Sequence, residues 1–177
     1  MTGCDHIGSI NGITKQRSFN TYMQLTGHSW SVRALSRLGN SEHISAIDIE
    51  GLTEYVIKIY CSKMKDDETR YTEISDIEQL RWELYSKHQV DGDLLLPTPA
   101  ALKFKLRRVN YISLVWKRQI AAFVATIPTI EENHGWNIEN GCPIAIMTHQ
   151  LPAPEFSLEL AVCKCKKSKC AENRCTS

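Results

Sequence analysis

Hydrophobic side chains recur every three or four residues over three long segments of the chain. Over residues 41–62 this spacing predicts an α-helix, because positions three and four apart share one helix face. Ser41 is a suitable N-cap residue for this helix. Residues 72–87 show a shorter pattern of the same kind, which predicts a second amphipathic helix.

The longest predicted helix covers residues 98–125. Thr98 can cap it, and Pro99 suits the first helical position, where the N–H would be unpaired anyway. The apolar positions of this helix fall within about 120° of arc. They are Leu102, Leu106, Val109, Ile112, Trp116, Ile120 and Phe123. The stripe predicts a helix face packed on the core, and we expect all four tryptophans to be core anchors.

The pattern changes after Pro128. Residues 136–138 and 144–146 have the composition of two short strands, and Asn140 and Gly141 between them suit a tight turn. A further short helix is expected over residues 154–162. The fold class predicted is mainly α. We expect an irregular helical domain of four to six helices, one small β-hairpin, and a C-terminal tail that is either disordered or organised by zinc.

Composition and charge narrow the classes of function. Of 177 residues, 42% are hydrophobic, and the formal net charge is +1. No apolar run approaches the roughly 18 residues of a membrane helix. Residues 66–93 carry nine acidic and three basic side chains, whereas residues 97–125 carry six basic and no acidic ones. Either the two segments pack side by side, or the second presents a basic face, including Lys103 and Arg107, to nucleic-acid phosphates.

No arrangement of residues typical of a catalytic site is found. HExxH, GxSxG, P-loop and GxGxxG motifs are absent, and the six histidines are scattered. We expect His134 to be a turn residue beside the hairpin, and Cys61 and Cys142 to be buried thiols. The sequence suggests neither an enzyme nor a small-molecule substrate.

Four of the seven cysteines stand in the last fifteen residues, at the spacing C-x-C-x4-C-x4-C. Four thiolates so placed can surround one Zn²⁺ tetrahedrally. The predicted metal ligands are Cys163, Cys165, Cys170 and Cys175. Five cations favour the thiolate form and leave a basic surface for DNA, namely Lys164, Lys166, Lys167, Lys169 and Arg174. The alternative is a metal-free basic tail.

The segment Cys-Lys-Cys-Lys-Lys-Ser-Lys-Cys resembles the opening of the tesmin-type CXC module, a cysteine-rich DNA-binding repeat. The resemblance implies zinc binding and DNA binding. Two departures reduce it to half a module at most. The sequence given stops two residues after Cys175, and Arg174 stands where the module has a tyrosine that enters the DNA minor groove.

Residues 2–5, Thr-Gly-Cys-Asp, followed by Ser-Ile-Asn-Gly-Ile-Thr-Lys at residues 9–15, resemble the late part of a flap-endonuclease-like (PIN-type) nuclease domain. The resemblance implies that Asp5 is a remnant metal ligand and that the glycine-containing turn holds a DNA phosphate through backbone amides. Two-metal phosphodiester chemistry needs several converging carboxylates, and Asp5 is alone here.

Taken in order, the motifs resemble the C-terminal portion of a mobile-element-like protein family of arthropods and cnidarians. The resemblance includes residues 96–102, 110–111, 134–136 and 152–154. It implies a nuclease-hairpin remnant in residues 1–27, a helical domain in residues 28–162 and a partial CXC tail in residues 163–177. We expect a non-enzymatic, zinc-binding, DNA-associated protein of the nucleus. The alternatives are a fragment of a metal-dependent nuclease and an inactive remnant.

Overall fold

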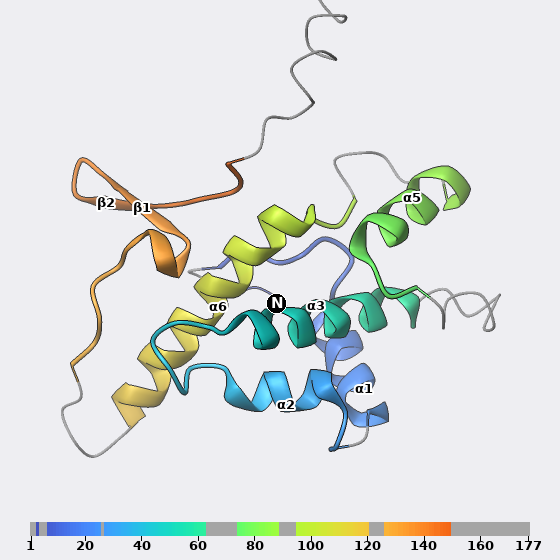
Figure 1. The fold of residues 1–177 in the computed structure, drawn as a ribbon, viewed down its shortest axis with the longest axis horizontal. Helices are drawn as coiled ribbons and strands as arrows, with labels where there is room; N and C mark the ends of the chain where they lie inside the picture. The colour runs from blue at the N-terminus through green and yellow to red at the C-terminus, as the bar shows by residue number, and fades with distance from the viewer. Residues whose placement is uncertain are drawn as a thin grey trace, which may run out of the picture. The chain divides into compact units, whose positions relative to one another are not determined.

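The computed structural model describes residue 3 and residues 7–25, 27–62, 74–88, 95–120 and 126–149. The chain divides into a unit of residues 1–147 and a unit of residues 148–177. The first unit is mainly helical with one two-stranded antiparallel hairpin (Figure 1), which confirms the predicted fold class. The predicted helix over residues 154–162 and the cysteine-rich tail lie outside the described residues.

All five described α-helices begin at a side-chain cap. The caps are Thr14 for α1 (Lys15–Gln24), Ser29 for α2 (Trp30–Arg37), Ser45 for α3 (Ala46–Cys61), Asp76 for α5 (Ile77–His88) and Thr98 for α6 (Pro99–Ile120). In each, the cap oxygen accepts a hydrogen bond from a backbone N–H of the first turn. The prediction that Ser41 caps the helix over residues 41–62 is therefore wrong, because this helix is α3 and its cap is Ser45. The hydroxyl of Ser41 instead donates to the carbonyl of His43 at 2.7 Å, within the loop that precedes α3.

The centre of the core is α3. It packs against α1, α2, α5 (Ile77–His88) and α6 (Pro99–Ile120), and Figure 1 shows α2 running alongside it. Buried residues therefore lie on most of its circumference, namely Gly51, Leu52, Tyr55, Val56, Ile57, Ile59 and Tyr60. The core is completed by Ile10 and Ile13 from the N-terminal segment and by Leu102 and Leu106 from α6.

The apolar stripe of α6 is buried only in part. Val109 is the last buried residue of the stripe, Ile112 is half-buried, Trp116 is 50% exposed and Ile120 is 85% exposed. Trp30 and Trp82 are also at least half exposed. The expectation that all four tryptophans anchor the core is therefore wrong for three of them, because a helical period identifies a face but not how far a partner covers it.

The hairpin consists of β1 (Trp136–Glu139) and β2 (Cys142–Ala145), paired from Trp136 with Ala145 to Glu139 with Cys142. Asn140 and Gly141 form the turn, both with positive φ, which is the geometry that Asn-Gly favours. The predicted hairpin and its turn are confirmed. Cys142 is exposed, so the prediction that it is a buried thiol is wrong. Among the described helices, none is both long and apolar enough to cross a membrane.

Candidate functional site

The residues predicted to bind zinc lie outside the described part of the chain, as does Asp5. This applies to Cys163, Cys165, Cys170 and Cys175, and to the five neighbouring cations, Lys164, Lys166, Lys167, Lys169 and Arg174. Of the predicted site residues, Lys103 and Arg107 are described. Both lie on α6, four residues apart and therefore one turn apart on the same side of the helix.

Four of the six basic side chains of α6 donate hydrogen bonds to backbone carbonyls of connecting segments. Lys105 binds Ser9, Lys117 binds Leu38, Arg118 binds Thr126, and Arg108 binds Gly135 and Ile146. The sequence predicts either that this positive segment packs beside the acidic segment or that it presents a basic face to nucleic acid. Neither prediction includes the observed arrangement, in which the cations bind the backbone of loops. Lys103 remains exposed, and the guanidinium of Arg107 lies 5.4 Å from the ring centroid of Phe104.

The glycine-containing turn near the N-terminus precedes α1 directly. The N–H of Ile13 donates to the carbonyl of Ile10 at 3.1 Å, and both side chains are buried. Gly12 has φ +75, and Gly8 and Ser9 are exposed residues. The ammonium of Lys105 donates to the Ser9 carbonyl at 2.8 Å. Burial and the nearby Arg108 lower the pKa of Lys105.

A row of buried polar groups on α6 fixes two loops that lie far apart in sequence. The Nδ2 of Asn110 donates to the carbonyls of Ser41 and Glu42, and its Oδ1 accepts from the N–H of Gly39 at 2.8 Å. On the neighbouring side, Tyr111 donates to the carbonyl of Pro128 at 2.9 Å. The helix therefore determines where residues 39–42 and residues 128–135 lie.

Gly135 lets the second of these loops approach the helix closely. A Cβ at Gly135 would lie 2.5 Å from the carbonyl oxygen of Phe104, and its φ of +82 also favours glycine. The 3-10 helix η3 (Glu132–His134) ends immediately before this contact. The approach brings the side chain of His134 against α6.

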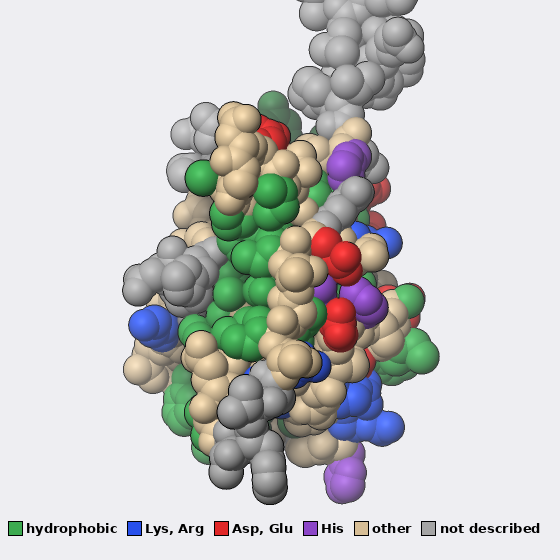
Figure 2. All heavy atoms as spheres, turned by 90° about the vertical axis from the view of Figure 1, so that its left-hand side faces the viewer, with side chains coloured by type: hydrophobic (Ala, Val, Ile, Leu, Met, Phe, Trp, Pro, Cys, Tyr) green, Lys and Arg blue, Asp and Glu red, His purple; other side chains and the backbone are tan. Residues whose placement is uncertain are grey.

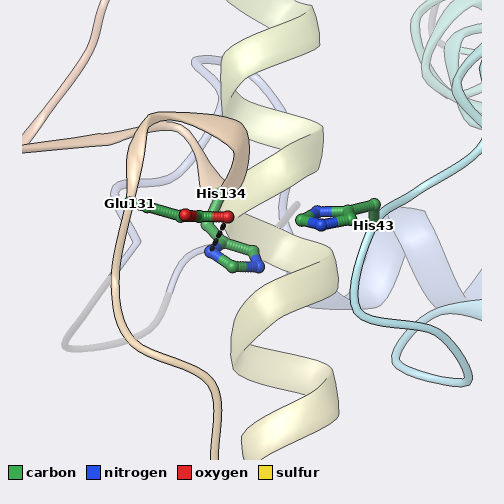
Figure 3. Close-up of side chains that lie close together, drawn as sticks. All are labelled: His43, Glu131 and His134. Carbon is green, nitrogen blue, oxygen red and sulfur yellow. Dashed lines mark ion pairs between the residues drawn. The ribbon is translucent and has the colours of Figure 1, made fainter.

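His43, Glu131 and His134 converge at this point (Figure 3). One ligand atom from each lies within 4.8 Å of the others. The rings of His43 and His134 are stacked, with centroids 5.2 Å apart, and the Tyr111 ring lies 4.7 Å from that of His134. The Glu131 carboxylate is 3.9 Å from the Nδ1 of His134. In the space-filling view, acidic and histidine side chains gather beside a run of hydrophobic ones (Figure 2).

His134 is 1% exposed, whereas His43 and Glu131 are exposed. Within the described residues, neither ring nitrogen of His134 has a hydrogen-bond partner of ordinary geometry. Burial lowers the pKa of His134 below its usual value of 6.5, and the charge of Glu131 opposes that shift. Burial therefore favours the neutral imidazole of His134, which is the form that ligates metals.

The sequence predicts that His134 lies beside the hairpin but does not connect it with His43 and Glu131. No local spacing could have done so, because ninety-one positions separate the two histidines. A weak signal was present in the Gly135 that follows His134, since a glycine beside a histidine can indicate a close backbone approach.

Comparisons of the chain with protein-family models, with curated proteins and with solved structures find no match. The resemblances to the CXC module and to the flap-endonuclease-like domain therefore stay predictions that rest on the motifs quoted above.

Proposed function

We propose that the chain is a non-enzymatic, nucleic-acid-associated protein that acts in the nucleus and carries a zinc site in its C-terminal tail. The observation that carries the proposal is the contact between Lys105 and Ser9. It brings an ammonium group beside an exposed, glycine-containing turn that leads into a helix N-terminus. Exposed backbone N–H groups, a helix N-terminus and a nearby cation together favour an anionic phosphate.

Two further cations of α6 support the proposal. Lys103 is exposed, and Arg107 keeps part of its side chain in solvent above Phe104. Because Arg108, Lys117 and Arg118 are occupied by backbone carbonyls, Lys103 and Arg107 join Lys105 as the α6 side chains that we assign to phosphate contacts. Contacts of this kind give affinity that falls with salt and carries little sequence preference.

The tail supports the zinc part of the proposal through its spacing alone. Cys163, Cys165, Cys170 and Cys175 supply four sulfur ligands, the set that structural zinc sites use. A segment of this size has no core of its own, so metal binding would supply its folding energy. Its lysines would then extend the basic surface.

The DNA-binding test compares alanine variants of the full chain across a salt series. Replacing Lys103→Ala and Arg107→Ala should weaken duplex binding and reduce the slope of log affinity against log salt by about one to two. Arg33→Ala, an exposed arginine on α2, is the control and should change the affinity little. The same affinity and slope in the double variant and in the parent would contradict the proposed contacts.

The zinc test measures metal content by mass spectrometry after purification under reducing conditions. The double variant Cys163→Ser and Cys165→Ser should lose about one equivalent relative to the parent chain. Equal zinc content in the two proteins would remove the tail site from the proposal.

A further inference from the structure

We propose that His43, Glu131 and His134 form a second metal site, within the helical body, for a divalent transition metal of the Zn²⁺ class. Two imidazoles and one carboxylate are a ligand set that binds zinc with a fourth position open to water. The site shares no residue with the cysteine-rich tail. It goes beyond the proposed function, which does not need it.

The distances suit an ion after small side-chain movements. Zinc bonds to nitrogen and oxygen of about 2.0–2.2 Å place neighbouring ligand atoms about 3.3–3.6 Å apart in a tetrahedral site. The three ligand atoms now lie within 4.8 Å of one another. His43 and Glu131 are exposed and can rotate about their side-chain bonds, whereas buried His134 provides the fixed ligand.

His134 supplies the independent reason to expect a ligand here. Buried polar atoms almost always have a partner. The rings of His43 and Tyr111 pack against the ring of His134. They do not provide a hydrogen-bond partner for its two nitrogens. The Glu131 carboxylate is 3.9 Å from Nδ1 and the backbone of Glu42 lies near the ring, but neither nitrogen has a hydrogen bond of ordinary geometry. A metal ion bound to one of these nitrogens would provide a partner for the lone pair of that nitrogen.

The fold prearranges the ligands from two separate segments. Asn110 anchors residues 39–42, immediately before His43, and Tyr111 anchors Pro128, near Glu131. Both anchors are consecutive residues of α6, so the same turn of helix positions both halves of the site. A bound ion would link the loop before α3 to the segment before β1, and would stabilise the folded state by mass action.

The test uses the full chain with the tail ligands removed, Cys163→Ser, Cys165→Ser, Cys170→Ser and Cys175→Ser, so that the tail does not compete. After chelator treatment, this protein is titrated with Zn²⁺ by calorimetry and with Co²⁺ by absorption spectroscopy. We expect about one equivalent to bind. The Co²⁺ spectrum should show d–d bands without the strong sulfur charge-transfer absorption that thiolate ligands give.

Matched variants identify the ligands. His43→Ala and Glu131→Gln change exposed side chains, so folding should be kept, and each should weaken Zn²⁺ binding more than about tenfold, the loss seen even for outer-shell partners. His28→Ala, another exposed histidine, is the control and should leave the affinity unchanged. Zn²⁺ should also raise the melting temperature of the tail variant but not of its His43→Ala derivative.

Each outcome bears on one site only. No binding by the tail variant, binding that His43→Ala leaves unchanged, or a Co²⁺ spectrum dominated by sulfur charge transfer would overturn the proposed site. None of these results concerns the tail zinc or DNA binding, which are tested with other variants. Loss of zinc from the double cysteine variant would likewise leave the His43–Glu131–His134 site unaffected.

Discussion

The guanidinium of Arg108 donates a hydrogen bond of 2.9 Å to the carbonyl oxygen of Gly135, and Arg108 is 4% exposed. The same Nη1 atom also donates to the carbonyl of Ile146 at 2.6 Å. Gly135 precedes β1 and Ile146 follows β2, so one buried cation holds the two ends of the hairpin against α6. The N–H of Ile146 donates to Gly135 as well, which closes the base of the hairpin.

Replacing Arg108→Leu should lower the free energy of unfolding by about 2–4 kcal/mol. The substitution keeps apolar volume but leaves two carbonyl oxygens without their charged donor, and hydrogen bonds to charged groups are the costly ones to lose. Urea unfolding followed by circular dichroism measures the change. Hydrogen exchange should also show that the amides of β1 and β2 lose protection.

The control for this prediction is Arg107→Leu, one residue earlier on the same helix. Its side chain is half-exposed and contacts the ring of Phe104, so the loss should stay within about 0.5 kcal/mol. Similar losses in the two variants would show that Arg108 does not hold the hairpin.

Gly39→Ala should destabilise the chain by about 2 kcal/mol or more. Gly39 has φ +72, and a Cβ there would lie 2.5 Å from the backbone carbon of Ser113. The methyl group can be accommodated only if the loop moves away from α6, which also weakens the bond between the Gly39 N–H and Asn110. Thermal and urea unfolding measure the loss.

Gly27→Ala is the matched comparison, because no atom lies within 4 Å of a Cβ at that position. It should be neutral or slightly stabilising, since alanine reduces the freedom of the unfolded chain. If Gly39→Ala proved equally neutral, the close approach between residue 39 and α6 would be wrong.

The elements predicted best are those in which the apolar spacing extends over several helical turns, or in which the sequence identifies a specific turn. In α3 and α6 the apolar spacing extends over several turns, and in the hairpin Asn140 and Gly141 identify the turn directly. In contrast, α1 and α2 are not predicted. They are short, and α1 leaves Phe19 and Met23 exposed, so its apolar face does not coincide with a buried one. Local periodicity is informative only where one face is consistently covered.

The site was less accessible to sequence reasoning than the fold. The cations of α6 could be counted, but their partners are backbone carbonyls, which carry no sequence signature. Lys105 and Ser9, for example, are ninety-six positions apart. The meeting of His43 with His134 depends in the same way on how Asn110 and Tyr111 anchor two loops. Tertiary contacts of this kind follow from the fold and cannot be read from spacing.

Tyr60 should make stability fall in alkaline solution. Burial raises its pKa from 10.0 to about 12, and the nearby charge of Arg17 opposes the shift. The folded state holds the phenol proton more tightly, so its contribution is complete below pH 10 and is lost as the pH rises from 10 towards 12. A shift of this size corresponds to about 2–3 kcal/mol.

Tyr60→Phe should flatten the alkaline fall while slightly lowering stability at neutral pH. The phenol donates to the carbonyl of Asn11, and its removal costs about 1 kcal/mol. Urea unfolding of both proteins from neutral pH to above pH 10 measures the difference between their free energies of unfolding. The titration of lysines and of other tyrosines is common to both proteins and cancels in this difference. Parallel curves for the two proteins would contradict the raised pKa.

Cys142 and Cys61 should differ in their rate of alkylation in the folded chain. Cys142 is exposed on β2, whereas burial raises the pKa of the Cys61 thiol and reduces the thiolate that reacts. With iodoacetamide at neutral pH, peptide mass spectrometry should show Cys142 modified well before Cys61. Unfolding in urea should bring the two rates together, because the difference arises from the fold. Equal rates in the folded chain would mean that α3 exposes its C-terminal thiol, and hence that the core around Tyr60 is looser than described.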